Sequence, residues 1–250
     1  METSDKPRAP DPGGGLADDP RRIRIPDDEA AWEGLIEVGQ HVLEASDLVV
    51  LPTDTVYGVG CNPFDPTAVD HVFDAKGRGR TLPLPVLVHD WRQAIGLVDA
   101  LDERAKSLIA EFWPGPLTLV MAEAPGIGWD LGDSRGTVAV RMPKQPFTLA
   151  LIKQVGPLAV TSANRSGQPT PATVPEIMAQ LDRHVGVYFD AGPLPPSGEG
   201  GEGKDPSSLA PPSTIVDLTA RRARVLRIGA IHPADIWRVL DEPVDDQAAP

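Results

Sequence analysis

Three cations stand close together in the segment KGRGR at residues 76–80, where glycines separate Lys76, Arg78 and Arg80. The 250-residue chain is otherwise acidic, because 23 Lys and Arg against 36 Asp and Glu give a formal net charge of −13. Lys and Arg side chains bind phosphates and carboxylates, and glycine lets the backbone approach a ligand closely. The segment indicates an anion-binding loop, although a solvated basic loop that pairs with surface acids explains it equally well.

Small hydroxyl and amide side chains stand at the ends of expected strands. PTDTVYG (52–58) follows the first strand, TSANRSG (161–167) follows another, and PPSTIV (211–216) enters a third, while Arg141 and Arg227 close two more. In an open α/β sheet, strand ends converge on the ligand crevice. Hydroxyl, amide and guanidinium groups bind phosphates and carboxylates without changing protonation state. Each segment by itself is also explained by ordinary turn and capping chemistry.

The common catalytic and nucleotide-binding motifs are missing. GEGGEGK (198–204) matches the start of a phosphate-binding loop, but Asp205 stands where Ser or Thr is needed for magnesium, and no helical pattern follows. No G-x-G-x-x-G follows the first strand, and no G-x-S-x-G nucleophile turn is present. No Cys/His cluster has metal-site spacing. We therefore expect no metal site built by protein ligands.

The composition indicates a protein of a reducing compartment. Cys61 is the single cysteine, so no internal disulfide forms. No apolar run reaches the roughly 18 residues that a membrane span needs, and METSDKPRAPDPGGG lacks the apolar segment of a signal peptide. We expect a cytoplasmic location and no membrane partner. The negative net charge also disfavours a generally basic surface for nucleic acid.

The hydrophobic pattern predicts interleaved helices and strands, which is typical of α/β architecture with a mixed sheet. We expect helices at residues 27–45, 66–76, 90–99, 102–112, 146–155, 174–184 and 233–240. We expect strands at residues 47–52, 85–89, 116–121, 137–142, 157–162, 185–190, 213–218 and 224–228. Asp65-Pro66 and Gly77 are typical start and stop signals for the helix that ends at Lys76.

The domain organisation follows from composition. Residues 1–20 are rich in Pro, Gly and Asp and are predicted to be a disordered leader. Residues 191–212 are of low complexity and are predicted to be a flexible loop within a single domain at 21–240. Residues 241–250 are predicted to be an acidic tail.

The order of these motifs resembles the YrdC-like family of threonylcarbamoyl-AMP synthases. PTDTVYGVG, KGR, FWPGPLTLV, TVAVRMP, TSANRSG, STIVDLT and VLRIG follow one another as in that family, over about residues 23–240. The pairing of K-x-R with a later S-x-N is specific when it stands among those neighbours. Here it comprises Lys76, Arg78, Ser162 and Asn164.

The resemblance implies a single α/β domain whose twisted mixed sheet, flanked by helices, surrounds a positively charged cleft. It also implies that L-threonine, bicarbonate or CO2, and ATP are converted to L-threonylcarbamoyl-AMP and pyrophosphate, with Mg2+ on the ATP phosphates. A downstream partner complex then transfers the threonylcarbamoyl group to adenosine 37 of tRNA. Pyrophosphate is a good leaving group, so positioning and fixed cations suffice without a covalent nucleophile.

The resemblance also implies roles for individual residues. The catalytic set is Lys76, Arg78, Ser162 and Asn164. The ATP-binding set is Arg78, Thr137, Ser162, Thr170 and Arg227. The L-threonine-binding set is Thr55, His89, Arg141, Ser213 and the backbone at Val160. Arg141 is expected to clamp the carboxylate with two hydrogen bonds, and Arg80 is matched more loosely to a phosphate contact.

Two departures and two rival functions accompany this hypothesis. Asp54 stands where glutamate is common in the family, and Pro211-Pro212 precedes Ser213 where a glutamate often stands. One rival is a non-catalytic YrdC-like module that binds tRNA or double-stranded RNA. The other is a different carbamoyl-adenylate reaction, as in larger hydrogenase-maturation proteins. The complete K-x-R and S-x-N motifs favour the synthase, and the net charge of −13 disfavours a role limited to RNA binding.

Overall fold

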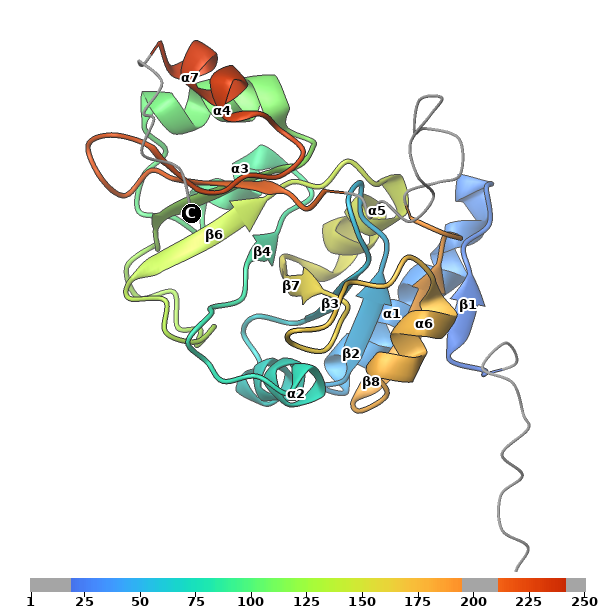
Figure 1. The fold of residues 1–250 in the computed structure, drawn as a ribbon. Helices are drawn as coiled ribbons and strands as arrows, with labels where there is room; N and C mark the ends of the chain where they lie inside the picture. Colours follow the sequence, from blue (N-terminus) through green and yellow to red (C-terminus); the bar gives the residue numbers. More distant parts are fainter. Residues whose placement is uncertain (1–18, 195–210, 242–250) are drawn as a thin grey trace, which may run out of the picture.

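In residues 19–194 and 211–241, which the computed structural model describes, ten strands form one twisted mixed sheet (Figure 1). The strands are β1 (Arg22–Arg24), β2 (Leu48–Leu51), β3 (Gly58–Cys61), β4 (Val86–Leu87), β5 (Leu117–Ala122), β6 (Thr137–Arg141), β7 (Leu158–Ser162), β8 (Val185–Asp190), β9 (Thr214–Asp217) and β10 (Arg224–Arg227). Their order in the sheet is β1-β8-β2-β3-β7-β4-β6-β5-β9-β10. Parallel and antiparallel neighbours both occur, as in the pairs β2–β8 and β2–β3.

Helices flank this sheet. They are the 3-10 helix η2 (Glu29–Trp32) and the α-helices α1 (Glu33–Glu44), α2 (Pro66–Lys76), α3 (Trp91–Ile95), α4 (Glu103–Phe112), α5 (Pro146–Val155), α6 (Val174–Gln180) and α7 (Pro233–Leu240). The predicted mixed α/β architecture, with a twisted sheet flanked by helices, is thereby confirmed.

The two faces of the sheet contribute to two separate hydrophobic cores. Along β2, Val49 and Leu51 belong to one core, whereas Leu48 and Val50 belong to the other. This alternation follows from the two-residue period of a strand. Helices α1 and α5 cover the first face, where Phe147 of α5 is fully buried. Helices α2, α4, α6 and α7 contribute to the larger core on the second face.

Helix α2 begins and ends where the sequence predicts. The Asp65 side chain accepts hydrogen bonds from the backbone amides of Thr67 (2.9 Å) and Ala68 (3.2 Å), which caps the first turn. Gly77 ends the helix in the left-handed conformation, with φ of 60°. Lys76 therefore lies in the last turn, and its side chain is 2% exposed.

Strand β3 is absent from the sequence-based expectations because its residues GVGC show no strand-like pattern. An added Cβ at Gly58 would lie 2.4 Å from Val160 Cγ1, and one at Gly60 would lie 2.6 Å from Val160 Cγ2. The two glycines therefore leave room for the Val160 side chain of the neighbouring strand β7. Strand β1 was also missed, because its three residues are ordered by parallel pairing with β8, far away in the sequence.

Several expected elements are shorter than predicted, among them the helix expected at 27–45, which is the 3-10 helix η2 followed by α1. The strand expected at 85–89 is limited to the two residues of β4, the helix expected at 90–99 ends before Gly96 as α3, and the helix expected at 174–184 ends at Gln180 as α6. Most of the expected leader, low-complexity loop and acidic tail fall on residues 1–18, 195–210 and 242–250, which lie outside the described residues.

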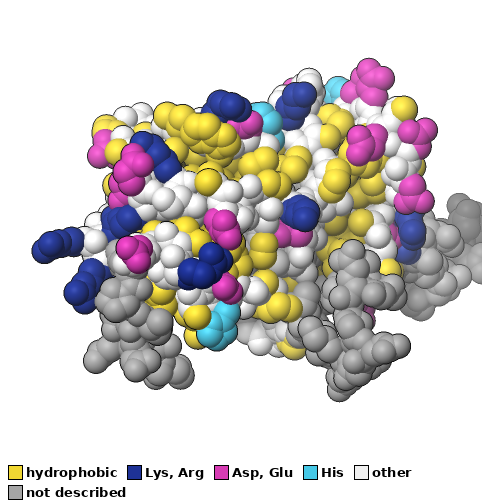
Figure 2. Space-filling view, turned by 90° about the horizontal axis from the view of Figure 1, so that it is seen from above, with side chains coloured by type: hydrophobic (Ala, Val, Ile, Leu, Met, Phe, Trp, Pro, Cys, Tyr) yellow, Lys and Arg dark blue, Asp and Glu magenta, His cyan; other side chains and the backbone are white. Residues whose placement is uncertain are grey.

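No helix in the described part of the chain is long and apolar enough to cross a membrane. On the face shown in Figure 2, basic and acidic side chains are interspersed among apolar and neutral ones. The positively charged cleft therefore stays an expectation.

Candidate functional site

Several strand ends and one helix end meet in the same region of the protein. Arg141 ends β6, Ser162 ends β7, Ser213 directly precedes β9, and Lys76 ends α2. Thr55 lies in the loop between β2 and β3. Hydrogen bonds in this region join residues 86 to 95 positions apart in the sequence. The fold thus brings together motifs that the sequence only shows in order.

Arg141 is buried and held by three protein groups. Its Nε donates to the Gly115 carbonyl (3.0 Å), its Nη1 to Thr55 Oγ1 (3.1 Å) and its Nη2 to Asp54 Oδ1 (2.7 Å). Burial lowers the pKa of Arg141, whereas the charge of Asp54 and the hydrogen bond to it raise that pKa. A buried guanidinium needs such a partner, because an unpaired buried charge is costly.

The hydroxyl groups of the PTDT loop lie close together. Arg141 Nη1 donates to Thr55 Oγ1, which lies 3.0 Å from Thr53 Oγ1. Thr53 Oγ1 donates to the Val56 carbonyl at 2.6 Å. This arrangement leaves a lone pair of Thr55 Oγ1 available to accept a further hydrogen bond. Thr55 is therefore suited to bind a donor group such as an amine.

Arg227 and Ser213 form a second cationic contact nearby. Arg227 Nη2 donates to the carbonyl (2.8 Å) and the hydroxyl (2.9 Å) of Ser213, and Ser213 Oγ lies 2.9 Å from Thr118 Oγ1. Burial lowers the pKa of Arg227, and the positive charge of Arg141 lowers it further. The two arginines are thus close enough to repel each other, so an anion between them would be stabilised.

Lys76 joins α2 to the S-x-N segment. Its ammonium group donates to the carbonyl oxygens of Ser162 and Asn164, the latter at 2.8 Å. Burial, followed by the positive charge of Arg78, lowers the pKa of Lys76 to about 7. Lys76 thus contacts the backbone of Ser162 and Asn164 and not their side chains. Lys76 therefore holds the loop that carries their side chains.

The side chains of the S-x-N segment form a polar cluster. Ser162 Oγ donates to Asn164 Oδ1 at 2.5 Å, and Thr170 Oγ1 donates to the same oxygen at 3.2 Å. The Asn164 amide nitrogen donates to the carbonyls of Arg165 (2.9 Å) and Gln168 (2.7 Å). Ser162 and Thr170, both predicted to bind ATP, are thereby placed side by side around Asn164.

Arg78 and Arg80 differ in their environments. Arg78 is half-buried, its Nη2 donates to the Leu82 carbonyl at 3.2 Å, and its buried Nε has no hydrogen-bond partner in residues 19–194 and 211–241. Arg80 instead forms ion pairs with Asp70 and, at 2.8 Å, with Asp130 on the surface. Within the described residues Arg78 Nη1 makes no hydrogen bond and is left for an anion, whereas the loosely matched phosphate contact of Arg80 gains no support.

Three basic side chains of the candidate site lack an acidic partner in the part of the chain that the structure describes. Within the described residues, Lys76, Arg78 and Arg227 have no carboxylate partner within 4.0 Å, whereas Arg141 is paired with Asp54. Burial is the first cause of the lowered pKa of each of the three unpaired cations. Buried or half-buried cations without counter-ions are expected where a protein binds an anionic ligand.

Thr137 lies at the far end of β6 from Arg141, beside a hollow of about 450 Å³. A strand rises about 3.3 Å per residue, so the two residues are roughly 13 Å apart along the same face of the sheet. The hollow is lined by apolar and a few polar groups, and its volume is typical of small-molecule sites. The lining residues are Thr81, Pro83, Leu84, Val120, Leu131, Asp133, Ser134, Arg135, Thr137, Ala139 and Leu226.

His89 and Val160 are less closely connected to the other predicted residues. His89 Nδ1 donates to Gln93 Oε1 at 3.1 Å, which leaves Nε2 as an acceptor. The backbone amide of Val160 donates to the Pro85 carbonyl at 2.8 Å, so this amide is already used by the protein. His89 follows β4, which pairs with β6 at Arg141, and therefore lies beside the Arg141 end of the site.

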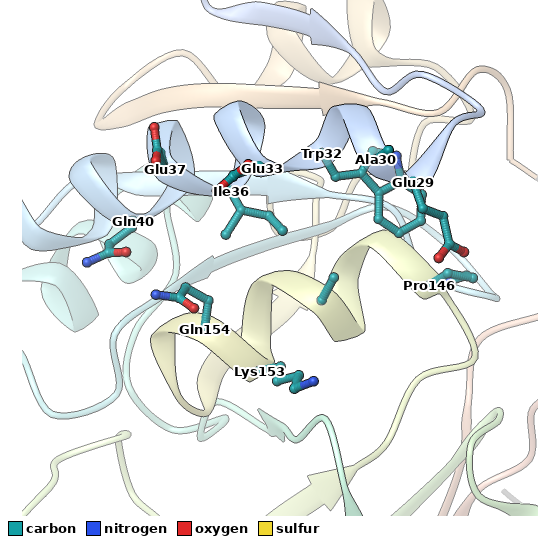
Figure 3. Close-up of a pocket in the computed structure, with 11 residues that line it drawn as sticks. Glu29, Ala30, Trp32, Glu33, Ile36, Glu37, Gln40, Pro146, Lys153 and Gln154 are labelled. Atoms are coloured by element: carbon teal, nitrogen blue, oxygen red, sulfur yellow. The ribbon is translucent and has the colours of Figure 1, made fainter.

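A second hollow, of about 610 Å³, lies between α1 and α5 (Figure 3). None of the predicted site residues lines it. Its lining residues are Glu29, Ala30, Trp32, Glu33, Ile36, Glu37, Gln40, Pro146, Ala150, Lys153 and Gln154.

Three residues of the site were not assigned a role from the sequence. Asp54 contacts Arg141, Thr118 contacts Ser213, and Leu226 lines the hollow beside Thr137 although its side chain is 56% exposed. The position of Asp54 next to Thr55 in the PTDT motif was a usable signal. Thr118 and Leu226 stand in ordinary strand patterns, and no feature of the sequence distinguishes them.

No group of three or more His, Cys, Asp or Glu side chains able to hold a metal occurs in the described ranges. The fold and the site together define an α/β protein with a mixed sheet whose strand ends carry cations and hydroxyl groups.

The chain belongs to the Sua5/YciO/YrdC family, whose model, described as "Telomere recombination", matches residues 41–229. A Mycobacterium tuberculosis relative, provisionally named threonylcarbamoyl-AMP synthase, is 47% identical over 198 residues, which cover 79% of this chain and 85% of the relative. The threonylcarbamoyl-AMP synthase of Pyrococcus abyssi is 35% identical over 215 residues, or 86% of this chain and 59% of the relative.

Solved structures of the family agree with this fold. The structure of P. abyssi Sua5 complexed with L-threonine superposes with a TM-score of 0.75 at 31% identity, covering 88% of this chain and 60% of that chain. The chain thus spans about three fifths of the P. abyssi protein. Escherichia coli YciO, at 22% identity and a TM-score of 0.70, shares the fold over 84% of this chain and 95% of its own.

Proposed function

We propose that this protein is an L-threonylcarbamoyladenylate synthase, a nucleotidyltransferase that makes threonylcarbamoyl-AMP and pyrophosphate from L-threonine, bicarbonate or CO2, and ATP. The observation that carries the proposal is the contact between the K-x-R and S-x-N segments through Lys76, which joins residues 86 and 88 positions apart. Relatives that share this family are named as threonylcarbamoyl-AMP synthases, and the solved P. abyssi relative was complexed with L-threonine.

The amino-acid substrate binds at the Arg141 end of the site in this proposal. Arg141 receives the threonine carboxylate, Thr55 offers an acceptor lone pair, and Ser213 and His89 complete the surroundings. Carbamate formation joins the threonine nitrogen to the carbon of CO2, and the amine loses a proton. A carbamate oxygen then attacks the α-phosphorus of ATP, the new P–O bond forms, and the bond to pyrophosphate breaks.

ATP occupies the region from Thr137 toward the unpaired cations. The hollow beside Thr137 takes the base, and Arg78 and Arg227 stabilise the negative charge that develops around phosphorus. Ser162 and Thr170 supply hydroxyl groups to the nucleotide. Lys76 keeps the Ser162–Asn164 loop in position for this role. Holding the two reactants in place is the main contribution expected of such a site.

A magnesium ion, if used, is held mainly by the ATP phosphates, since the described residues supply no cluster of metal ligands. The product then passes to a complex that transfers the threonylcarbamoyl group to adenosine 37 of tRNA. We place these steps in the cytoplasm, in line with the single cysteine.

The test is direct. Purified protein is incubated with ATP, bicarbonate and labelled L-threonine, and threonylcarbamoyl-AMP and pyrophosphate are measured by chromatography. We expect product only when all three substrates are present, and at least a hundredfold less with Arg78→Ala. Absence of product with L-threonine, under conditions where the protein is folded and binds ATP, would refute the proposal.

A further inference from the structure

Asp54 is a charged residue of the site to which the proposed reaction gives no role. Its Oδ1 accepts hydrogen bonds from Arg141 Nη2 (2.7 Å) and from the backbone amide of Lys144 (2.8 Å). Oδ2 receives no hydrogen bond from the described residues. A carboxylate accepts bonds at both oxygens, so one oxygen of Asp54 is left for another donor.

Arg141 likewise has hydrogen-bonding groups that the described residues do not use. Its guanidinium has five N–H groups, and three of them, one on each nitrogen, are used by Gly115, Thr55 and Asp54. One N–H is left on each terminal nitrogen. Two N–H groups on the terminal nitrogens are what a carboxylate needs for two parallel hydrogen bonds. The pair therefore has two donors and one anionic acceptor unused.

Arg141 is sheltered from water, whereas the Asp54 residue lies at the surface with its side chain turned toward Arg141. The Arg141 side chain is 8% exposed and the Asp54 side chain 13% exposed. Electrostatic interactions are stronger in such surroundings than in bulk water. A ligand that carries only a carboxylate gains from Arg141 and is repelled by Asp54. A ligand that carries a carboxylate and an ammonium group on the same carbon atom can bind favourably to both residues.

We propose that Asp54 binds the α-ammonium group of the substrate while Arg141 binds its carboxylate, so that the pair selects a zwitterionic α-amino acid. This inference rests on the proposed function and deepens it. The lone pair of Thr55 Oγ1 is a second acceptor beside Arg141, since Thr55 and Asp54 bind its two terminal nitrogens.

The ion pair has a simpler explanation, in which Asp54 only orients Arg141. The two explanations differ for ligands without an amino group. If Asp54 only orients Arg141, its loss weakens every carboxylate ligand equally. If Asp54 binds the ammonium group, its loss weakens amino acids and spares, or even strengthens, the binding of plain carboxylates.

The experiment compares Asp54→Asn with the wild-type protein, with a non-hydrolysable ATP analogue bound and no bicarbonate added. Calorimetry measures the affinity for L-threonine and for 3-hydroxybutyrate, which has the same carbon skeleton without the amino group. We expect Asp54→Asn to lower the affinity for L-threonine at least tenfold. The affinity for 3-hydroxybutyrate should stay unchanged or increase. Equal losses for both ligands, or no loss for L-threonine, would overturn the inference.

Two further variants complete the design. Asp54→Glu keeps the charge and should retain most of the L-threonine affinity. Asp130→Asn is the matched control, because Asp130 forms an exposed ion pair with Arg80 outside the site, and it should leave both affinities unchanged.

The wild-type protein provides a measurement that does not depend on the folding of any variant. It should bind 3-hydroxybutyrate at least tenfold more weakly than L-threonine, and equal affinities would contradict the inference. Failure of the wild-type protein to bind L-threonine at all, while the ATP analogue binds, would instead refute the proposed function itself.

Discussion

At the scale of single residues, the site depends on cations whose environments differ. Arg141 has a counter-ion in Asp54, whereas Lys76 is buried against backbone carbonyls and close to the positive charge of Arg78. A charge without a counter-ion is destabilised by burial, and the pKa of Lys76 accordingly lies at about 7, below the ordinary 10.5 of lysine. Both residues therefore make testable contributions to stability.

Lys76 should make stability rise with pH. Between its folded pKa of about 7 and its ordinary value of 10.5, the unfolded chain binds a proton that the folded protein does not. The free energy of unfolding consequently increases with pH over that interval and is insensitive to Lys76 below pH 7. Urea unfolding at several pH values should show the free energy of unfolding of the wild-type protein rising relative to that of Lys76→Met over this interval. Parallel pH profiles for the two proteins would contradict the assignment.

Arg141→Ala should affect both stability and threonine binding. Removing one partner of a buried ion pair leaves the other charge unpaired, which costs about 3 kcal/mol of unfolding free energy. Affinity for L-threonine should fall at least a hundredfold, while affinity for ATP changes much less. Urea unfolding and calorimetry measure the two effects. Arg80→Ala, which removes exposed ion pairs, is the control for stability and should cost less than about 1 kcal/mol of unfolding free energy. Equal losses of L-threonine and ATP affinity in Arg141→Ala would show that the assignment of Arg141 to the carboxylate is wrong.

At the scale of elements, the packing of β3 against β7 determines where the PTDT and S-x-N motifs lie. Gly58 pairs with Ser162, and Gly60 pairs with Val160. The Val160 side chain fills the space above both glycines. Strand β3 pairs with both β2 and β7, so the ends of these two strands lie on either side of it, and its glycines leave the space that the Val160 side chain occupies.

Gly60→Ala should destabilise the protein. The new Cβ would lie 2.6 Å from Val160 Cγ2 and 2.9 Å from the Ala159 carbonyl oxygen, and the backbone atom has little freedom to move. Overpacking of this kind costs about 1–3 kcal/mol. Gly79→Ala is the matched control, since nothing lies within 4 Å of its Cβ position, and it should change stability by less than about 0.5 kcal/mol. Denaturant unfolding measures both, and equal small effects would contradict this account of β3.

At the scale of the whole molecule, the site exists only in the folded protein. Its members come from β6, β7, α2, the β2–β3 loop and the segments around β9 and β10. Ligands that bind such a site bind the native state and not the unfolded chain, so they stabilise the whole domain.

The substrates should therefore raise the thermal unfolding temperature. At a ligand concentration of 100 times its Kd, the expected stabilisation is about 2.7 kcal/mol. Calorimetric scans with L-threonine and a non-hydrolysable ATP analogue measure it. Arg141→Ala should lose the contribution of L-threonine and keep that of the nucleotide. If L-threonine stabilised the variant as much as the wild-type protein, the threonine site would have to lie elsewhere.

Much of this architecture was determined by the sequence alone, because its signals are local. Asp65 and Gly77 marked the ends of α2 through capping and the left-handed conformation, and those contacts form within a few residues. The order of the motifs likewise indicated the family that the comparisons establish. Strand β3 was not predicted because its glycines are needed to leave room for Val160, roughly one hundred residues away in the sequence. No local sequence pattern indicates such a contact.

Tertiary structure alone decided what each charged residue does. KGRGR presents three similar cations in the sequence, yet Lys76 holds two carbonyls, Arg78 keeps an unused buried donor, and Arg80 pairs with surface acids. Asp54 likewise becomes the counter-ion of Arg141 only when β6 lies beside the PTDT loop. The physical reason is that a residue's type sets its charge, whereas burial and neighbouring groups, which depend on the complete fold, set how that charge is used.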